Sequence, residues 1–544
     1  MKKILLIFLA ISIFSCKNES EEKTSSAVVQ DTIQGPKEMD FKVLDSKYVS
    51  KDTILAPFEK EIESFSSERY NQLKPLILDK DIPSLQASVK NGDFTYEDLV
   101  LFYLARIQKF DRENELSLNS VISLNPKVLE EARAKDAALK DGKEHHPIFG
   151  IPVLLKDNID AENMPTTAGA VALEQNKTKD AFITHRLKDN GALILGKANL
   201  SEWAYFFCED CPSGYSAIGG QTLNPYGRKI FDTGGSSSGS AVAVAANLVT
   251  VAVGSETAGS IISPSSQNSL VGLKPTIGLL SRGGIVPISS TLDTPGPITK
   301  SVVDNAILLS AMTGKDNQDL ASKGNKNSTK DFYSSVKEGS LKGKRFGAIK
   351  ELMEDTLYVQ AIADLRNAGA EVVEFKAVEV DLPNFTRFLN LEMKRDLPLY
   401  FKSYGDNNLK FKTVADVVAY NLQDSLQRAP YGQGLFDGIV ADSATPEEYQ
   451  AIKDTLHTNG MKFFDVPMKE NNLDGVISIN NYHAGEAAVA LYPGITVPMG
   501  YTENNEPEGL TFFAKPNKEQ DLLQWAYSYE TATKKRKSPE NYNQ

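Results

Sequence analysis

The stretch 232–264 reads DTGGSSSGSAVAVAANLVTVAVGSETAGSIISP and organises the interpretation of the whole chain. It begins and ends with turns rich in glycine and serine, and a run of small and apolar residues lies between them. That run has too little charge for a linker and too much alanine and valine for a disordered segment. It therefore predicts a buried helix followed by a buried strand, with serines presented on tight backbone at both ends.

A lysine upstream of these turns is a candidate for the base that takes the proton from a serine nucleophile. Lys156 follows an apolar run, 151–155, that predicts a buried strand, although a lysine at a strand end taken alone is read as a solvated terminus. Amide hydrolysis needs a nucleophile, a base and donors for the oxyanion. Only five histidines occur and none lies in a Gly/Ser turn. A lysine whose pKa is lowered by burial can take the place of histidine.

Three segments carry a resemblance to a known family. They are Lys-Asp at 156–157, GGSSSGS at 234–240 and GSETAGSI at 254–261. In this combination they resemble the amidase signature family, and further matching segments, at 166–169, 196–199, 219–222 and 272–276, extend the resemblance over nearly the whole mature chain.

This resemblance implies a catalytic triad. Ser260 would be the nucleophile, Ser236 a bridging serine after a cis peptide bond, and Lys156 the base at the end of the relay. The implied reaction is hydrolysis of a carboxamide C–N bond to a carboxylate and ammonia or an amine, through an acyl-enzyme. No metal and no organic cofactor is implied.

The resemblance also assigns an oxyanion hole and suggests a substrate. Backbone N–H groups of Thr257, Ala258 and Gly259 would receive the oxyanion. Ile262 stands where many members have arginine, and Ala258 where an acidic residue is frequent, so contacts with a charged substrate group are not expected. The turn is most similar to that of bacterial peptide amidases. A small-molecule or peptide amide, including a peptide's C-terminal amide, is the expected substrate.

Alternative functions come from two other classes. The segment GSSSG at 235–239 matches the nucleophile elbow of α/β-hydrolases, which would make Ser237 the nucleophile of an esterase with His457 or His483 as base. That elbow requires a buried strand before it, and 228–232 is a poor strand. The other alternative is a non-catalytic surface lipoprotein that binds amides or peptides.

The N-terminus predicts export. Two lysines precede an apolar run at 4–14, and Ser15 and Cys16 follow it. The segment Ile13-Phe14-Ser15-Cys16 resembles a lipobox whose cysteine is lipidated. Residues 1–16 are thus expected to be a signal peptide and 17–50 a flexible polar tether. The expected location is the bacterial cell envelope, with membrane contact through the lipid anchor only.

Composition and pattern indicate the fold class. Apolar strands alternate with helices, which predicts one large α/β domain over 51–536 with a central mixed, largely parallel twisted sheet covered by helices on both faces. A surface insertion is expected at 314–342, a variable helical substrate region at 380–465, and a tail at 537–544. The net charge of −12 argues against a nucleic-acid partner.

Two further cysteines form a CxxC pair, Cys208 and Cys211. No second pair accompanies them, so a zinc site is not expected, and either a local disulfide or two free thiols fits the sequence.

Overall fold

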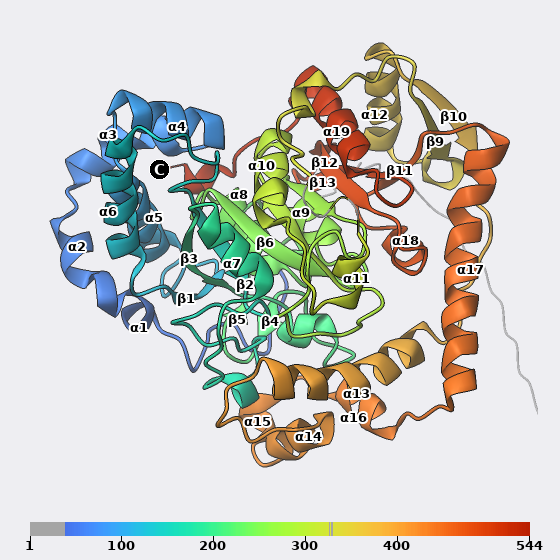
Figure 1. Cartoon of the computed structure of the whole chain (residues 1–544), viewed down its shortest axis with the longest axis horizontal. Helices are drawn as coiled ribbons and strands as arrows, with labels where there is room; N and C mark the ends of the chain where they lie inside the picture. The colour runs from blue at the N-terminus through green and yellow to red at the C-terminus, as the bar shows by residue number, and fades with distance from the viewer. Residues whose placement is uncertain (1–37, 326, 328–329, 544) are drawn as a thin grey trace, which may run out of the picture. The chain divides into compact units, whose positions relative to one another are not determined.

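An eleven-stranded mixed sheet runs through the residues that the computed structural model describes, 38–325, 327 and 330–543 (Figure 1). The strand order is β1-β3-β2-β6-β8-β7-β12-β13-β11-β9-β10. Parallel pairs join β3, β2 and β6 near one end and β11, β9 and β10 at the other, and antiparallel pairs join the strands between them. The predicted single α/β domain with a mixed sheet is confirmed, and the described residues from Glu38 onwards form one compact unit.

The strands of this sheet have the following bounds: β1 Val121–Leu124, β2 Pro152–Lys156, β3 Leu193–Ala198, β6 Val251–Glu256, β7 Val271–Lys274, β8 Thr294–Thr299, β9 Arg345–Ile349, β10 Glu371–Phe375, β11 Gly475–Ile479, β12 Gly494–Tyr501 and β13 Pro507–Phe513. A separate two-stranded sheet pairs β4 (Tyr215–Ser216) with β5 (Gly220–Gln221).

The helices are α1 Lys51–Leu55, α2 Glu59–Ser64, α3 Ser67–Ile77, α4 Ile82–Asn91, α5 Tyr96–Phe110, α6 Val128–Ala138, α7 Phe182–Asp189, α8 Ser238–Ala245, α9 Ile262–Gln267, α10 Val302–Met312, α11 Leu320–Lys323, α12 Thr356–Asn367, α13 Phe385–Ser403, α14 Val414–Leu422, α15 Ser425–Arg428, α16 Gly434–Ala441, α17 Pro446–Glu470, α18 Ala484–Val489 and α19 Glu519–Thr533. None of the helices in the described ranges is both long and apolar enough to cross a bilayer.

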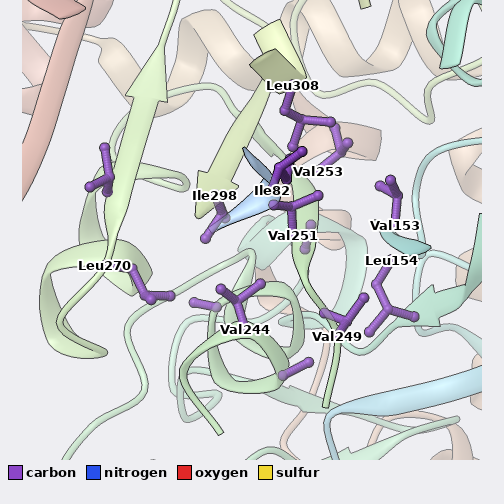
Figure 2. Packing of buried hydrophobic residues seen from close by; sticks show 14 of the residues in the cluster. Ile82, Val153, Leu154, Val244, Val249, Val251, Val253, Leu270, Ile298 and Leu308 are labelled. Carbon is purple, nitrogen blue, oxygen red and sulfur yellow. The ribbon is translucent and has the colours of Figure 1, made fainter. Parts of the chain in front are cut away.

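The predicted helix and strand between the two serine turns are α8 and β6. Every residue of both elements is buried, which explains why the segment carries no charge before Glu256. Gly239 of α8 lies so close to Asn199 that a Cβ would come within 2.5 Å of its backbone. Figure 2 shows Val153 and Leu154 of β2 gathered with Val244 and Val251 in the core. This packing fixes both serine turns to the sheet.

Strand β13 and residues 38–50 are among the segments that differ from the sequence-based expectation. Strand β13 was not predicted, because its residues PEGLTFF begin with turn-forming types. Residues 38–50, assigned to the flexible tether, instead contact the domain: the N–H of Gln221 donates to the Leu44 carbonyl (2.8 Å), and the Ser46 hydroxyl donates to the Ile218 carbonyl (2.5 Å). Residues 1–37, with the predicted signal peptide and Cys16, lie outside the described residues.

Candidate active site

Lys156 is the last residue of β2, between the parallel neighbours β3 and β6. Its side chain is fully buried, with 0% of its surface exposed, so it is not the solvated strand end that its position alone would indicate. Nζ donates to the Ser236 hydroxyl (2.7 Å) and to the carbonyl and hydroxyl of Ser255 (2.9 and 3.0 Å). The structure therefore brings this lysine to the first serine turn.

Burial changes the charge state of this amine. The loss of hydration lowers the pKa of Lys156 to about 7, and the carboxylates of Asp293 and Glu256 oppose the shift only in part. Near neutral pH a large fraction of Lys156 is thus uncharged. An uncharged amine on a serine hydroxyl can accept a proton.

Ser236 lies in a turn that is held from several sides. The peptide bond between Gly235 and Ser236 is cis, as the family resemblance implies. The N–H of Ser201 donates to the Ser236 carbonyl (3.1 Å), and the Ser238 hydroxyl donates to the Gly234 carbonyl (2.6 Å). The Ser236 side chain is fully buried beside Lys156, so its orientation is set by the protein and not by solvent.

The second serine turn is organised by Glu256. Its buried carboxylate accepts the N–H groups of Ile261 (2.7 Å) and Ile262 (3.0 Å), which curls the backbone over residues 257–260. Gly259 has φ +84°, a conformation that favours glycine. None of the four N–H groups from 257 to 260 donates to another group within the described part of the chain. They are available to stabilise a developing negative charge.

Ser260 follows directly, and 9% of its surface is exposed. The N–H of Ser237 donates to its carbonyl (3.2 Å), which joins the two serine turns through the backbone. Among the described residues, the hydroxyls of Ser236 and Ser260 are not hydrogen-bonded to each other. Catalytic contacts of this kind often tighten only when substrate is bound.

Three further residues belong to the site and were not predicted. Ser255 receives hydrogen bonds from both Lys156 and the Asn158 side chain (2.9 Å). Asp293 accepts the Thr257 hydroxyl (2.6 Å), and burial raises the pKa of this carboxyl to about 6. Ser255 was visible in the quoted stretch, and Asn158 follows Lys156-Asp157. Asp293 was visible only as part of a turn, because its contact with Thr257 depends on the fold.

Lys197 ends the segment Gly191-x4-Gly196-Lys197, which partly matches a phosphate-binding loop, but its side chain has a structural partner. It forms a buried ion pair with Asp157 (3.0 Å) and donates to the Thr166 hydroxyl (3.1 Å). Asp157 also accepts the N–H of Thr167 (3.2 Å). This ion pair ties β3 to the loop after β2 and so supports the strand end that carries Lys156.

The α/β-hydrolase alternative is wrong. Ser237 is fully buried, and its hydroxyl donates to the Ser255 carbonyl (3.1 Å) and accepts the Ser255 N–H (3.2 Å). His457 is bonded to the Val489 carbonyl and His483 to the Ser478 hydroxyl. No strand precedes Ser237 in 228–232, so the elbow geometry is also missing.

Cys208 and Cys211 form a disulfide. Of the two possibilities that the sequence left open, the local bridge is therefore the one the structure contains. Within the described residues, no group of three histidine, cysteine or carboxylate side chains is arranged to hold a metal ion.

Comparison with known proteins now decides the family. The family model described as Amidase matches residues 98–429. A probable amidase of Arabidopsis thaliana is 35% identical over 489 residues, which covers 85% of this chain and 92% of the plant protein. This chain belongs to the amidase signature family. It is accordingly an enzyme that hydrolyses amide C–N bonds.

Solved structures of other amidases agree with the fold described above. An amidase family protein from Bacillus anthracis has a TM-score of 0.87 at 36% identity, covering 93% of this chain and all of that one. The peptide amidase of Stenotrophomonas maltophilia has a TM-score of 0.79 at 38% identity, covering 85% of this chain and 98% of that one.

In this amidase, the positions near the nucleophile that often carry charge are apolar. Ile262 is fully buried in the core, and Ala258 is half-buried against a second hydrophobic cluster. The turn therefore offers no charged side chain of its own to a substrate.

Proposed function

We propose that this amidase cleaves a carboxamide, with a peptide's C-terminal amide as its substrate, through a Ser260, Ser236 and Lys156 relay and an acyl-enzyme. The hydrogen bond between Ser236 and the buried Lys156, whose pKa is lowered to about 7, is the observation that carries this proposal. The likeness to the peptide amidase of Stenotrophomonas maltophilia supports the choice of substrate.

In the acylation step, the Ser260 hydroxyl attacks the carboxamide carbon. Its proton passes to Ser236, whose own proton passes to the Nζ of Lys156. The N–H groups of 257–260 bind the oxyanion. The proton then returns along the same path to the leaving nitrogen, so the C–N bond breaks, ammonia leaves, and Ser260 holds the acyl group as an ester.

Deacylation uses the same groups in the second half of the cycle. A water molecule attacks the ester carbon and gives its proton to the relay, and the relay returns a proton to the Ser260 oxygen. The products are the free carboxylate and the regenerated enzyme. Lysine suits both halves, because a pKa near 7 lets it accept and release a proton at neutral pH.

Single substitutions test these roles. Lys156→Ala, Ser236→Ala and Ser260→Ala should each lower kcat/KM for a peptide amide at least about a thousandfold while the protein stays folded. The exposed Ser425→Ala serves as the matched control. A fluorophosphonate probe should label wild-type protein on Ser260. A folded wild type that neither reacts nor hydrolyses amides would instead favour the non-catalytic binding lipoprotein.

We also propose that the enzyme is exported and anchored to the cell envelope through lipidated Cys16, on the strength of the lipobox-like segment before it. Expression in a bacterial host should give protein that partitions into the detergent phase. Mass spectrometry should find the lipid on Cys16. Partitioning that is unchanged in Cys16→Ser would refute the anchor.

A further inference from the structure

The side chain of Asn481 lies directly against the turn that precedes the nucleophile. A Cβ placed on Gly259 would be 3.1 Å from the Asn481 amide nitrogen and 3.4 Å from the Cβ of Ala484. Gly259 is the residue before Ser260. A primary amide thus lies beside the N–H groups expected to bind the oxyanion, although Asn481 is far from them in sequence.

The backbone that carries Asn481 is held firmly by its neighbour Asn480. The N–H of Asn480 donates to the Gly509 carbonyl, and the Gly509 N–H donates to the Asn480 side chain, both at 2.8 Å. The Thr511 hydroxyl donates to the Asn480 carbonyl (2.5 Å). These bonds fasten the turn after β11 to β13, so the position of Asn481 is set by the sheet.

In contrast to its neighbour, Asn481 does not use its own side chain in the fold. The residue is half-buried, and within the described part of the chain its carboxamide has no hydrogen-bond partner. A carboxamide offers both a donor and an acceptor, which is the complement of a peptide group. Preorganised polar groups of this kind beside a reacting centre fix the orientation of a substrate.

A pocket with a mixed apolar and polar lining lies at the end of the helix that follows this turn. Helix α18 begins at Ala484, beside Gly259, and ends at Val489, which lines a pocket. Apolar side chains line part of this pocket, namely Leu292, Phe388, Leu456, Val489 and Leu491, and polar or charged side chains line the rest, namely Thr291, Lys453, Asp454 and His457. The apolar residues belong to the same hydrophobic cluster that contacts Ala258 of the oxyanion turn.

We propose that Asn481 binds the peptide group on the acyl side of the scissile carboxamide, so that the enzyme selects amides of N-acylated amino acids over simple carboxamides. This inference rests on the proposed function. It assigns to Asn481 a role in specificity and none in proton transfer, because no hydrogen bond among the described residues connects its side chain to Lys156 or Ser236.

A matched pair of substrates isolates this contact. N-acetyl-phenylalaninamide and 3-phenylpropanamide present the same aromatic side chain and the same scissile carboxamide, but only the first has the additional peptide group. The ratio of their kcat/KM values measures recognition of that group. In Asn481→Ala this ratio should fall about tenfold, as expected for the loss of a hydrogen-bonding contact, and mainly through KM. The exposed Asn407→Ala is the control and should keep the wild-type ratio.

Each outcome is informative. A ratio that is unchanged in Asn481→Ala, or an equal loss on both substrates, overturns the inference, since the latter would show a structural role at the oxyanion turn. Wild-type protein that hydrolyses 3-phenylpropanamide but not the peptide amide would overturn it as well, while leaving amide hydrolysis intact. Failure of the proposed function itself differs, because wild-type protein would then hydrolyse neither substrate.

Discussion

Lys156 shows how one buried residue sets the chemistry of this site. An amine at the end of a solvated strand would be charged at neutral pH and would be a poor base. Here the side chain is fully buried and its pKa falls to about 7. Its three hydrogen bonds, to Ser236 and Ser255, hold Nζ in position. The environment thus supplies what a histidine supplies in other serine hydrolases.

The pH dependence of activity should follow from this pKa. The uncharged amine is the active form, so kcat/KM should fall as pH decreases through about 7, approaching a tenfold loss per pH unit at lower pH. Initial rates between pH 5 and 9, with stability checked at each pH, measure this. A profile that stays flat down to pH 5 would contradict a lysine base.

Asp293→Asn provides a matched test of the same pKa. The Asp293 carboxylate raises the pKa of Lys156, so its removal should move the acidic limb of the profile to lower pH. An Asn side chain keeps an acceptor for the Thr257 hydroxyl. The exposed Asp437→Asn should leave the limb in place.

Among the elements, α13 and α17 form a clamp on the loop between β7 and β8. Glu392 of α13 is buried and accepts the hydroxyls of Ser289, Thr291 (2.7 Å) and Tyr449 (2.6 Å), the last from α17. These hydrogen bonds and Arg395 keep the pKa of Glu392 below its usual value despite burial. The clamped loop continues into Asp293, whose carboxylate accepts the Thr257 hydroxyl. The helical region is therefore connected to the oxyanion turn through this loop.

Glu392→Ala should therefore affect both stability and rate. It removes the shared acceptor of several buried groups, and we expect a loss of about 3 kcal/mol in the free energy of unfolding. Because the loop that carries Asp293 is released, kcat should also fall. Denaturant titration and steady-state kinetics check the two effects. The exposed Glu354→Ala is the control, and wild-type behaviour of Glu392→Ala would contradict the clamp.

At the scale of the whole molecule, a residue near the C-terminus packs against the N-terminal helices. The predicted tail, 537–544, includes Tyr542, which is buried and lies edge-on to Phe110 of α5, with ring centroids 5.5 Å apart. Its hydroxyl donates to the Leu116 carbonyl (2.9 Å), and its own carbonyl accepts a hydrogen bond from Arg106. Tyr542 is thus part of the core.

Tyr542→Ala should be strongly destabilising. Truncation of a buried aromatic side chain typically costs about 3 to 5 kcal/mol, because a cavity remains and packing is lost. Thermal unfolding followed by circular dichroism should show a clearly lower Tm, whereas the exposed neighbour Asn543→Ala should not. An unchanged Tm for Tyr542→Ala would show that the C-terminus does not support the fold.

Local pattern was enough to predict much of the fold. The buried α8 and β6 and the strand before Lys156 follow from runs of small and apolar residues, and helices were expected over 380–465 as well. Strand β13 was not predicted, because its proline, glutamate and glycine indicate a turn. Its assignment as a strand depends on pairing with β11 and β12, which the local sequence does not show. Strand assignment in such cases depends on partners distant in the chain.

The sequence by itself determined the two serine turns, the spacer between them and the family whose motifs they share, because these are local properties of neighbouring residues. Only the tertiary structure decided that Lys156 is buried and has its pKa lowered to about 7. It also decided that Asp293 accepts a hydrogen bond from Thr257 and that Asn481 lies against Gly259. Burial and electrostatic interaction depend on which distant segments meet in the folded sheet, and that information is spread over the whole chain.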